Sequence, residues 1–355
     1  MAKKSLGKRL LPVWQVALID ILIAGIALVI FAYFHHVRPS KLESEDIEIA
    51  RPTASVSASV LQTPTPLPEE TVELTPTPLP AAQTEPDEPG KFYNKFADKF
   101  TSGEVVSYIE SGVAFYQSKS LNITVTREKV ASTKGGEEDC TVYITDFYVG
   151  DIECLSTVFA NDSYSVGNYE WLTSMSERVG AIVAVNGDFY GARKNGVVIR
   201  NGKMYRSKHS TFDACVIYWD GTMETYASSD WDAQTLIDNN AYQAWSFGPR
   251  LLDENGTPLK KFNATDAVIK KNPRTAIGYF EPGHYCFVTV DGRSSASNGF
   301  TMSRLAEFMS EIGCTAAYNL DGGQSSSLVW GSEVISKPYK DGRKISDAIV
   351  LIDIE

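Results

Sequence analysis

The stretch Asn319-Leu320-Asp321-Gly322-Gly323-Gln324-Ser325-Ser326-Ser327 decides how this chain of 355 residues is organised. An apolar run, Cys314–Tyr318, precedes it and predicts a buried strand that ends in a carboxylate, two glycines and a row of hydroxyls. Glycines let the backbone turn there and let a ligand approach its N–H groups. The simpler interpretation is a tight turn after a buried strand, because Asp-Gly and Gly-Gly pairs mark turns in general.

A second part of the chain repeats this pattern. Residues 168–188 and 301–321 each read as a helix, a glycine, a five-residue apolar strand and then Asn-x-Asp. If the two strands are neighbours in one sheet, Asn186-Gly187-Asp188 and Asn319-Leu320-Asp321 lie side by side. Two aspartates that face one cleft suit acid–base catalysis, because burial and mutual repulsion separate their pKa values. The alternative is two similar turns in which each aspartate caps its own backbone.

Two arginines flank a predicted strand hairpin. Arg274 stands where the chain enters the hairpin, and Asp291-Gly292-Arg293 stands where the chain leaves it. Both guanidinium groups can therefore reach the same end of a sheet, and arginine binds phosphate or carboxylate through two parallel hydrogen bonds. Lone arginines beside turns are more often structural or solvated. The prediction of an anion-binding site therefore depends on the two arginines lying together.

These patterns define the candidate site residues. The catalytic candidates are Asp188, Asp321 and Asp291, and the candidates for binding substrate or phosphate are Arg274, Arg293, Asn186, Asn319, Gly322, Gly323 and Ser325. Carboxylates, amides, arginines and hydroxyls together suit a sugar that carries a phosphate or a similar anion. The sequence requires no cofactor, although carboxylate and amide oxygens are also the ligands that Ca²⁺ prefers. Ca²⁺ is therefore an open alternative.

Other chemistry finds little support in the sequence. His209 and His284 are the only histidines of the globular part, which excludes a multi-histidine metal site, and no G-x-S-x-G motif is present. The net charge of -11 argues against nucleic acid as a partner. The five cysteines show no metal-ligand spacing, and Cys140 with Cys154 is the pair to test as a disulfide.

The N-terminal part has a different composition. Residues 1–10 form a basic tail, and residues 11–34 are almost wholly apolar, long enough to span a bilayer as a helix. The basic flank predicts a signal-anchor with the N-terminus in the cytoplasm and the remainder outside the cell. A cleaved signal peptide is the alternative, but no small-x-small site follows the apolar run.

Residues 35–90 form a Pro/Thr-rich linker in which Thr-Pro-Thr-Pro-Leu-Pro occurs twice, at 63–68 and at 75–80. Such a composition predicts a disordered, semi-rigid stalk that holds the folded part away from the membrane. Residues 91–355 then form a single domain, in which predicted strands outnumber helices. We expect an α+β fold with a mixed or antiparallel sheet core and packed helices.

From about Ser120 to Glu355 the chain resembles the phosphodiester glycosidase family. The resemblance is carried by several motifs in the family's order: Asn186-Gly187-Asp188-Phe189-Tyr190, Gly196–Arg200 with Asn201-Gly202, Phe247-Gly248-Pro249, Asn272–Gly278, Asp291-Gly292-Arg293 and Asn319–Gly323. Gln324 stands where many members have a third glycine. The resemblance implies hydrolysis of a GlcNAc-1-phosphodiester-like bond in a cell-surface or extracellular glycan, with Asp188 or Asp321 activating water or attacking C1.

Two functions from other classes stay open at this point. One is a non-catalytic module that binds an anionic glycan of a wall or exopolysaccharide, and it needs the arginines without the carboxylates. The other is transfer of the glycosyl group to an alcohol other than water. The phosphorylated glycan is the expected partner in all three cases, besides the membrane that the N-terminal helix would enter.

Overall fold

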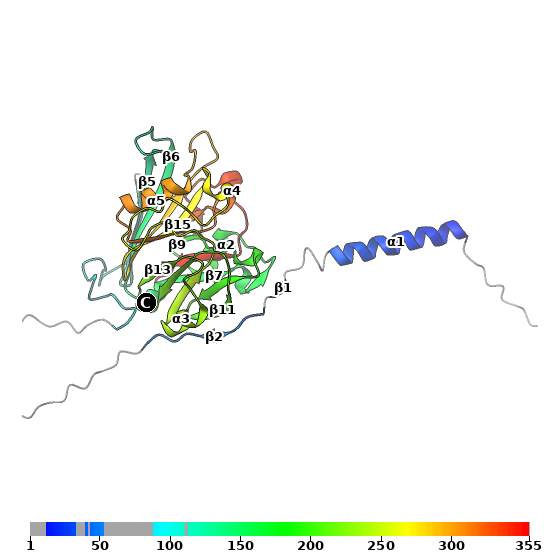
Figure 1. Cartoon of the computed structure of the whole chain (residues 1–355), viewed down its shortest axis with the longest axis horizontal. Helices are drawn as coiled ribbons and strands as arrows, with labels where there is room; N and C mark the ends of the chain where they lie inside the picture. Colours follow the sequence, from blue (N-terminus) through cyan, green and yellow to red (C-terminus); the bar gives the residue numbers. More distant parts are fainter. Residues whose placement is uncertain (1–11, 33–39, 42, 53–87, 111–112, 355) are drawn as a thin grey trace, which may run out of the picture.

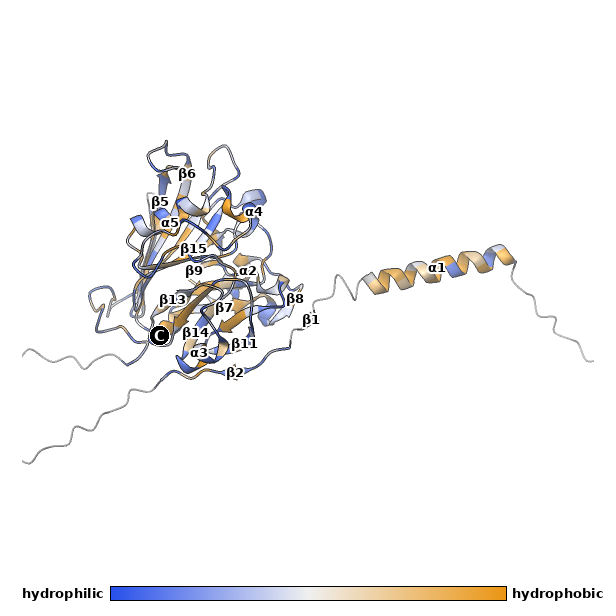
Figure 2. Ribbon diagram, in the orientation of Figure 1, coloured by the Kyte–Doolittle hydropathy of each residue, from blue (hydrophilic) through white to orange (hydrophobic). Residues whose placement is uncertain are grey.

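The computed structural model describes residues 12–32, 40–41, 43–52, 88–110 and 113–354 (Figure 1). The basic tail of residues 1–10 and both Thr-Pro repeats lie outside the described residues. Helix α1 (Val13–Ala32) is predominantly apolar, with Gln15 and Asp20 as its polar interruptions (Figure 2). Its length and composition suit a membrane span, although a signal sequence near an N-terminus has the same properties.

Three antiparallel sheets and a short two-stranded ladder make up the folded body. The seven-stranded sheet has the order β17 (Ala316–Asn319), β15 (Arg274–Glu281), β16 (His284–Val290), β6 (Cys140–Val149), β5 (Leu121–Val130), β4 (Val113–Gln117), β3 (Val106–Glu110). The six-stranded sheet has the order β13 (Met223–Tyr226), β12 (Ala214–Tyr218), β14 (Ala241–Trp245), β10 (Gly196–Arg200), β11 (Lys203–Lys208), β2 (Ile47–Glu48). The five-stranded sheet has the order β19 (Glu333–Val334), β18 (Leu328–Trp330), β9 (Val183–Asn186), β20 (Asp347–Leu351), β7 (Leu155–Phe159). Strands β1 (Ser40–Lys41) and β8 (Ser165–Val166) form the ladder.

The helices cover the sheets from outside. The main core combines inward-facing side chains from all three sheets, such as Phe287, Trp245 and Ile349. Helix α5 (Met302–Glu311) packs on the seven-stranded sheet in a second cluster, and α2 (Leu172–Val179) packs on the five-stranded sheet in a third. The short helices are α3 (Ala233–Asp238) and α4 (Asp266–Ile269). The α+β class and the antiparallel sheet core are therefore as predicted.

The two repeated units form as expected but lie in different sheets. In each unit a helix ends beside a glycine with positive φ, Gly180 (φ 64°) or Gly313 (φ 92°), and a strand ending in asparagine follows. Strand β9 is central in the five-stranded sheet, whereas β17 is an edge of the seven-stranded sheet. The expectation that the two strands are neighbours in one sheet is wrong, because local patterns do not encode which sheet a strand joins.

Residues 43–52, which the sequence placed in the linker, pack on the folded body. Strand β2 pairs with β11, Ile49 is buried, and Trp219 Nε1 donates to the Ile49 carbonyl at 2.7 Å. We call residues 43–52 the N-terminal strap. All five cysteines are free buried thiols, so Cys140 and Cys154 form no disulfide.

Candidate active site

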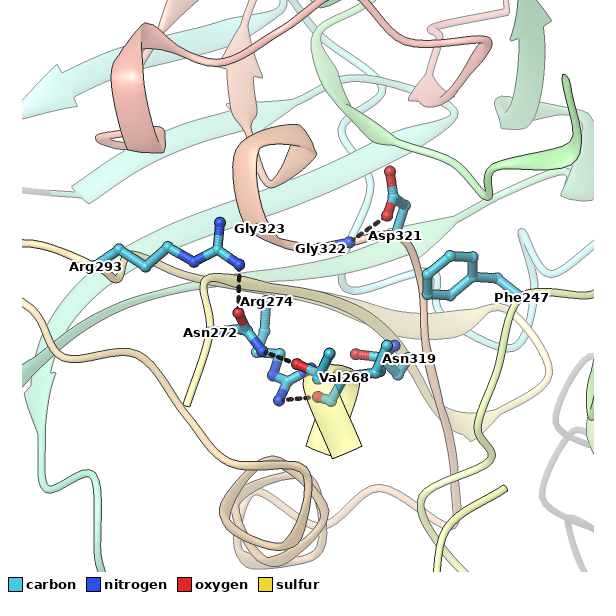
Figure 3. Close-up of a pocket in the computed structure, with 10 residues that line it drawn as sticks. Phe247, Val268, Asn272, Arg274, Arg293, Asn319, Asp321, Gly322 and Gly323 are labelled. Atoms are coloured by element: carbon cyan, nitrogen blue, oxygen red, sulfur yellow. Dashed lines mark hydrogen bonds between the residues drawn. The ribbon is translucent and has the colours of Figure 1, made fainter. Parts of the chain in front are cut away.

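A cavity of about 220 Å³ opens where the seven-stranded sheet meets the Gly322–Gly323 turn (Figure 3). Its lining residues come from four separate parts of the chain: Phe247, Ala267, Val268, Asn272, Arg274, Arg293, Asn319, Asp321, Gly322 and Gly323. Six of the ten residues that the sequence nominated therefore surround one cavity. Drug-sized sites occupy about 300–1,000 Å³, so this one suits a ligand as small as a single sugar with its phosphate.

Both nominated arginines lie at the cavity, and neither has a carboxylate within salt-bridge distance among the described residues. Arg274 is buried and donates from Nε to the Phe300 carbonyl at 2.9 Å and from Nη2 to the Val268 and Lys270 carbonyls. Burial and, to a smaller extent, the charge of Arg293 lower the pKa of Arg274 to about 9. Positive charge at this wall is thus left for an anionic ligand.

Arg293 is oriented by its surroundings. Its Nη2 donates to Asn272 Oδ1 at 2.6 Å, and its guanidinium lies 5.2 Å from the Tyr339 ring centroid. A side chain at position 323 would bring a Cβ within 3.3 Å of Arg293 Nη1, and the backbone there has a φ of 67°. Glycine at position 323 therefore leaves room for the arginine beside the cavity.

Asp321 is the carboxylate of the cavity. Its Oδ1 accepts from the Gly322 N–H at 2.9 Å, and its Oδ2 accepts from Ser325 Oγ at 2.5 Å and from Arg343 Nη2 at 2.7 Å. Arg343 Nε also donates to Ser325 Oγ at 2.6 Å. These donors fix the direction of the carboxylate while one side of Asp321 faces the cavity.

Asp188 has different surroundings. It is buried beneath the site, where Oδ1 accepts from Arg200 Nη2 (3.0 Å) and the Tyr190 N–H (3.1 Å), and Oδ2 accepts from the Ser246 N–H (3.1 Å). Arg200 also donates to Asp347 Oδ2 at 2.8 Å. Burial alone would lower the pKa of Arg200, but these two carboxylates outweigh it and raise the pKa. Asp188 therefore belongs to a buried ion-pair network and does not line the cavity.

Asp291 also lies off the cavity. Its Oδ1 accepts from the Lys337 N–H at 2.9 Å, and its backbone carbonyl accepts from Ser297 Oγ at 2.6 Å. Burial is the main reason that the pKa of Asp291 rises to about 6. Its contacts hold the turn that carries Arg293.

The nominated amide and hydroxyl groups divide in the same way. Asn186 is fully bonded inside the protein: Nδ2 donates to the Asp321 carbonyl at 2.8 Å, and Oδ1 accepts from Thr275 Oγ1 at 2.7 Å. Ser325 is buried against Asp321, and the Gly323 N–H donates to the Pro273 carbonyl at 3.0 Å. Asn319, by contrast, lines the cavity, and its buried Oδ1 has no partner among the described residues.

The two Asn-x-Asp ends do meet, although they belong to different sheets. The Asn186 side chain bonds the Asp321 carbonyl, and the Asp321 N–H donates to the Gly187 carbonyl at 3.3 Å. The first end therefore supports the backbone of the second. Only the second end presents its carboxylate to the cavity.

Sequence reasoning missed the residues that complete the site. Arg343 pairs with Asp321, and Asn272 holds Arg293. A signal for the first was present, because Asp341-Gly342-Arg343 repeats the motif Asp291-Gly292-Arg293. In the part of the chain that the structure describes, no group of three or more His, Cys, Asp or Glu side chains could hold a metal ion.

Comparisons with known proteins agree with this architecture. Residues 179–352 match the model of the phosphodiester glycosidase family. The SPbeta prophage-derived uncharacterized protein YomE of Bacillus subtilis (strain 168) is 33% identical over 198 residues, which cover 53% of this chain and 30% of that protein. The chain therefore corresponds to about a third of this curated relative.

Two solved structures share the fold. The catalytic domain of zebrafish N-acetylglucosamine-1-phosphodiester α-N-acetylglucosaminidase, auto-inhibited by its pro-peptide, gives a TM-score of 0.54 at 19% identity, over 71% of this chain and 88% of that one. A hypothetical protein from Synechocystis gives 0.50 at 13% identity, over 70% and 64% of the two chains. Residues 179–352, which match the phosphodiester glycosidase family, hold the cavity, both arginines and both Asn-x-Asp ends.

Proposed function

We propose that this protein is a hydrolase that cleaves a sugar-1-phosphodiester between the anomeric carbon and the bridging oxygen. The observation that carries the proposal is the composition of the cavity. It has one carboxylate, Asp321, and two arginines without carboxylate partners among the described residues. Ordinary glycosidases need a second carboxyl group to protonate the leaving oxygen. A departing phosphomonoester is already a good leaving group, so cations can replace that acid.

In the proposed reaction Asp321 accepts a proton from water as the water oxygen bonds C1. The C1–O bond breaks, and its electron pair leaves on the phosphate oxygen, which Arg274 and Arg293 stabilise. The products are a reducing sugar and a phosphomonoester. Direct attack of Asp321 on C1, followed by hydrolysis of the glycosyl-enzyme, gives the same products.

Asn319 is the proposed contact for a sugar hydroxyl. Its Nδ2 already donates to the Gly248 and Leu320 carbonyls at 3.0 and 2.9 Å, which leaves Oδ1 as an acceptor at the cavity. A buried acceptor without a donor costs free energy, and a sugar O–H would remove that cost. Phe247 provides an apolar wall for the face of the sugar ring.

The same proposal places the substrate outside the cytoplasm, in a cell-surface or extracellular glycan. It rests on α1 as a single-pass anchor and on the basic residues that precede it in the sequence. GlcNAc is the first sugar to test, because the zebrafish enzyme with this fold is named for a GlcNAc-1-phosphodiester.

The test is hydrolysis of methyl GlcNAc-1-phosphodiester by the full chain in ¹⁸O-labelled water. Cleavage of the C1–O bond leaves the methyl phosphate unlabelled, and we expect this result. Label in the methyl phosphate would show attack at phosphorus and contradict the proposal. Product that forms only with an added alcohol would indicate transfer, and glycan binding without any product would indicate a binding module.

A further inference from the structure

Arg193 is a cation held between two aromatic rings. It follows the 3-10 turn Tyr190–Ala192, and its guanidinium carbon lies 3.7 Å from the Phe212 ring centroid and 4.8 Å from that of Phe247. Among the described residues, its guanidinium makes one hydrogen bond, from Nη1 to the Ser246 carbonyl, and this bond is long, at 3.4 Å. Stacking on two rings holds a guanidinium plane in a fixed place while its edge N–H groups stay available.

The charge of Arg193 is poorly compensated within the protein. No carboxylate of the described residues lies within salt-bridge distance of it, whereas Arg178, Arg200 and Arg304 all have such partners. Burial lowers the pKa of Arg193, and the more distant Asp188, Tyr318 and Asp321 offset this only in part. A half-buried cation without a partner is stabilised when an anion binds.

Arg193 adjoins the cavity through Phe247. One face of the Phe247 ring contacts the guanidinium, and the same ring lines the cavity. Phe247 and Arg293 stand on opposite sides of the site in Figure 3, and Arg193 stacks on Phe247. An anion at Arg193 is therefore a second anion of the ligand.

We propose that Arg193 binds a second anionic group of the substrate, beyond the phosphodiester that is cleaved. This inference rests on the proposed function and narrows its substrate class to glycans with repeated anionic groups, either phosphate or carboxylate. Arg193 is in this account a specificity-determining residue that acts on substrate binding.

The test compares two synthetic substrates that differ by one phosphate. One is GlcNAc-1-phosphate esterified with 1,3-propanediol, and the other carries a further phosphate on the free hydroxyl. We consider the kcat/KM of the substrate with the further phosphate divided by that of the substrate without it. In Arg193→Gln we expect this ratio to fall about tenfold, through a higher KM for the first substrate, because one charge-assisted pair is lost. Lys194→Gln removes the same charge from the exposed neighbouring residue and leaves the ratio unchanged.

Two further measurements distinguish failure of the Arg193 inference from failure of the proposed hydrolase function. Arg193→Lys keeps the charge and recovers part of the ratio if the anion contact is real. Equal losses on both substrates in Arg193→Gln, or no loss on either, overturn the inference. If the wild type cleaves neither substrate, the proposed function has failed, and calorimetry with inorganic pyrophosphate decides the anion site. Binding that weakens about tenfold in Arg193→Gln supports it, and undetectable or unchanged binding overturns it.

The N-terminal strap carries a second, independent inference. Arg51 donates to Asp151 at 2.5 Å and lies 4.9 Å from the Trp219 ring centroid, and Glu45 accepts from the Ser207 N–H and hydroxyl. Downstream of residues 53–87, the Gly90 carbonyl accepts from the Ile152 N–H at 2.8 Å. The chain on both sides of residues 53–87, which we call the Pro/Thr-rich segment, therefore attaches to the turn at Asp151–Ile152.

This attachment limits the distance between helix and folded body. Only residues 33–39 separate Ala32 of α1 from Ser40 of β1, a span of at most about 29 Å at 3.6 Å per residue. We infer that the folded body works close to the membrane surface, and that the Pro/Thr-rich segment does not separate the two. The β1–β8 ladder together with the strap, and not that segment, sets the distance.

Energy transfer in lipid vesicles tests this inference on the full chain. A donor dye goes on Lys134→Cys, an exposed position whose thiol is distinguished from the five buried ones, and acceptors go in the bilayer. Deleting residues 55–85 should leave the transfer unchanged, whereas Ile49→Asp combined with Arg51→Ala should lower it. The inference is overturned if energy transfer rises in the deletion variant or is unchanged in the strap variant. It is also overturned if the wild type shows no transfer.

Discussion

Two strand ends in this molecule share the pattern Asn-x-Asp, and their aspartates have opposite surroundings. Asp188 is enclosed by Arg200 and two backbone N–H groups. Asp321 pairs with the half-exposed Arg343 and faces the cavity. One carboxylate serves the scaffold, and the other is available to a ligand.

The middle residue explains the difference. A Cβ on Gly187 would lie 2.6 Å from Asp347 Oδ1, so only glycine lets the second carboxylate of the buried network approach. The corresponding Leu320 is fully buried among the hydrophobic side chains of the main core. The repeated motif therefore marks a repeated scaffold whose two copies differ in the residue at the middle position.

The largest expected effect is on the buried side of this comparison. Arg200→Gln leaves Asp188 and Asp347 buried without a cation, which should lower the free energy of unfolding by about 3–5 kcal/mol. Urea unfolding followed by tryptophan fluorescence measures it. Arg178→Gln is the matched control, because it breaks pairs with Asp162 and Glu170 nearer the surface and should cost at most about 1 kcal/mol. Equal losses in the two variants would remove the distinction.

The next effect concerns the orientation of Asp321. Arg343→Gln removes the charged donor to Asp321 Oδ2, and kcat/KM on the GlcNAc phosphodiester should fall about 10–100-fold. The free energy of unfolding should change by less than about 1 kcal/mol, since Arg343 is half exposed. Lys344→Gln serves as the control from the adjacent residue. A loss of stability without a loss of activity would count against the catalytic role of this pair.

A smaller effect is expected at the phosphate contacts. Arg293→Gln should raise KM about tenfold and weaken inhibition by inorganic phosphate to the same degree. Asn272→Ala removes the acceptor that orients Arg293 and should raise KM and weaken phosphate inhibition to a smaller degree. Inhibition by phosphate that is unaltered in Arg293→Gln would place the leaving group elsewhere.

The smallest effect is on the pH dependence of stability through Asp291. Its pKa in the folded protein is raised to about 6, above the ordinary value, so protonation favours the folded state. This contribution is fully present below about pH 4 and is lost as the pH rises through 6. Relative to wild type, Asp291→Asn should therefore gain about 1–2 kcal/mol of stability between pH 4 and pH 7.5. A pH-independent difference would contradict the assignment.

Local sequence signals predicted much of the fold. Asn201-Gly202 and Asp220-Gly221 do lie in the turns of hairpins, β10–β11 and β12–β13, because these residue pairs favour the backbone conformations of tight turns. The helix over Thr301–Ile312 is α5. The strap was missed because its only strand has two residues and its anchoring partners, such as Trp219, lie far along the chain.

The site was predictable only in part, for a related reason. Asp321, Arg274, Arg293 and Asn319 are ends of strands in one sheet region, and strand ends can be recognised from sequence. The burial of Asp188 depends on Arg200 and Asp347, which are 12 and 159 residues away and carry no local mark of that role. Which carboxylate faces the cavity is therefore a property of the tertiary structure.

The most direct test of the central claim is a paired measurement of kcat/KM and unfolding free energy on Asp321→Asn and Asp188→Asn. We predict that Asp321→Asn loses roughly 10³-fold or more in kcat/KM while its stability changes by less than about 1 kcal/mol. Asp188→Asn should lose about 2–4 kcal/mol of stability while its folded fraction keeps kcat/KM within about tenfold. A stable Asp321→Asn variant that stays active would contradict the account. So would a folded Asp188→Asn variant that loses roughly 10³-fold in kcat/KM.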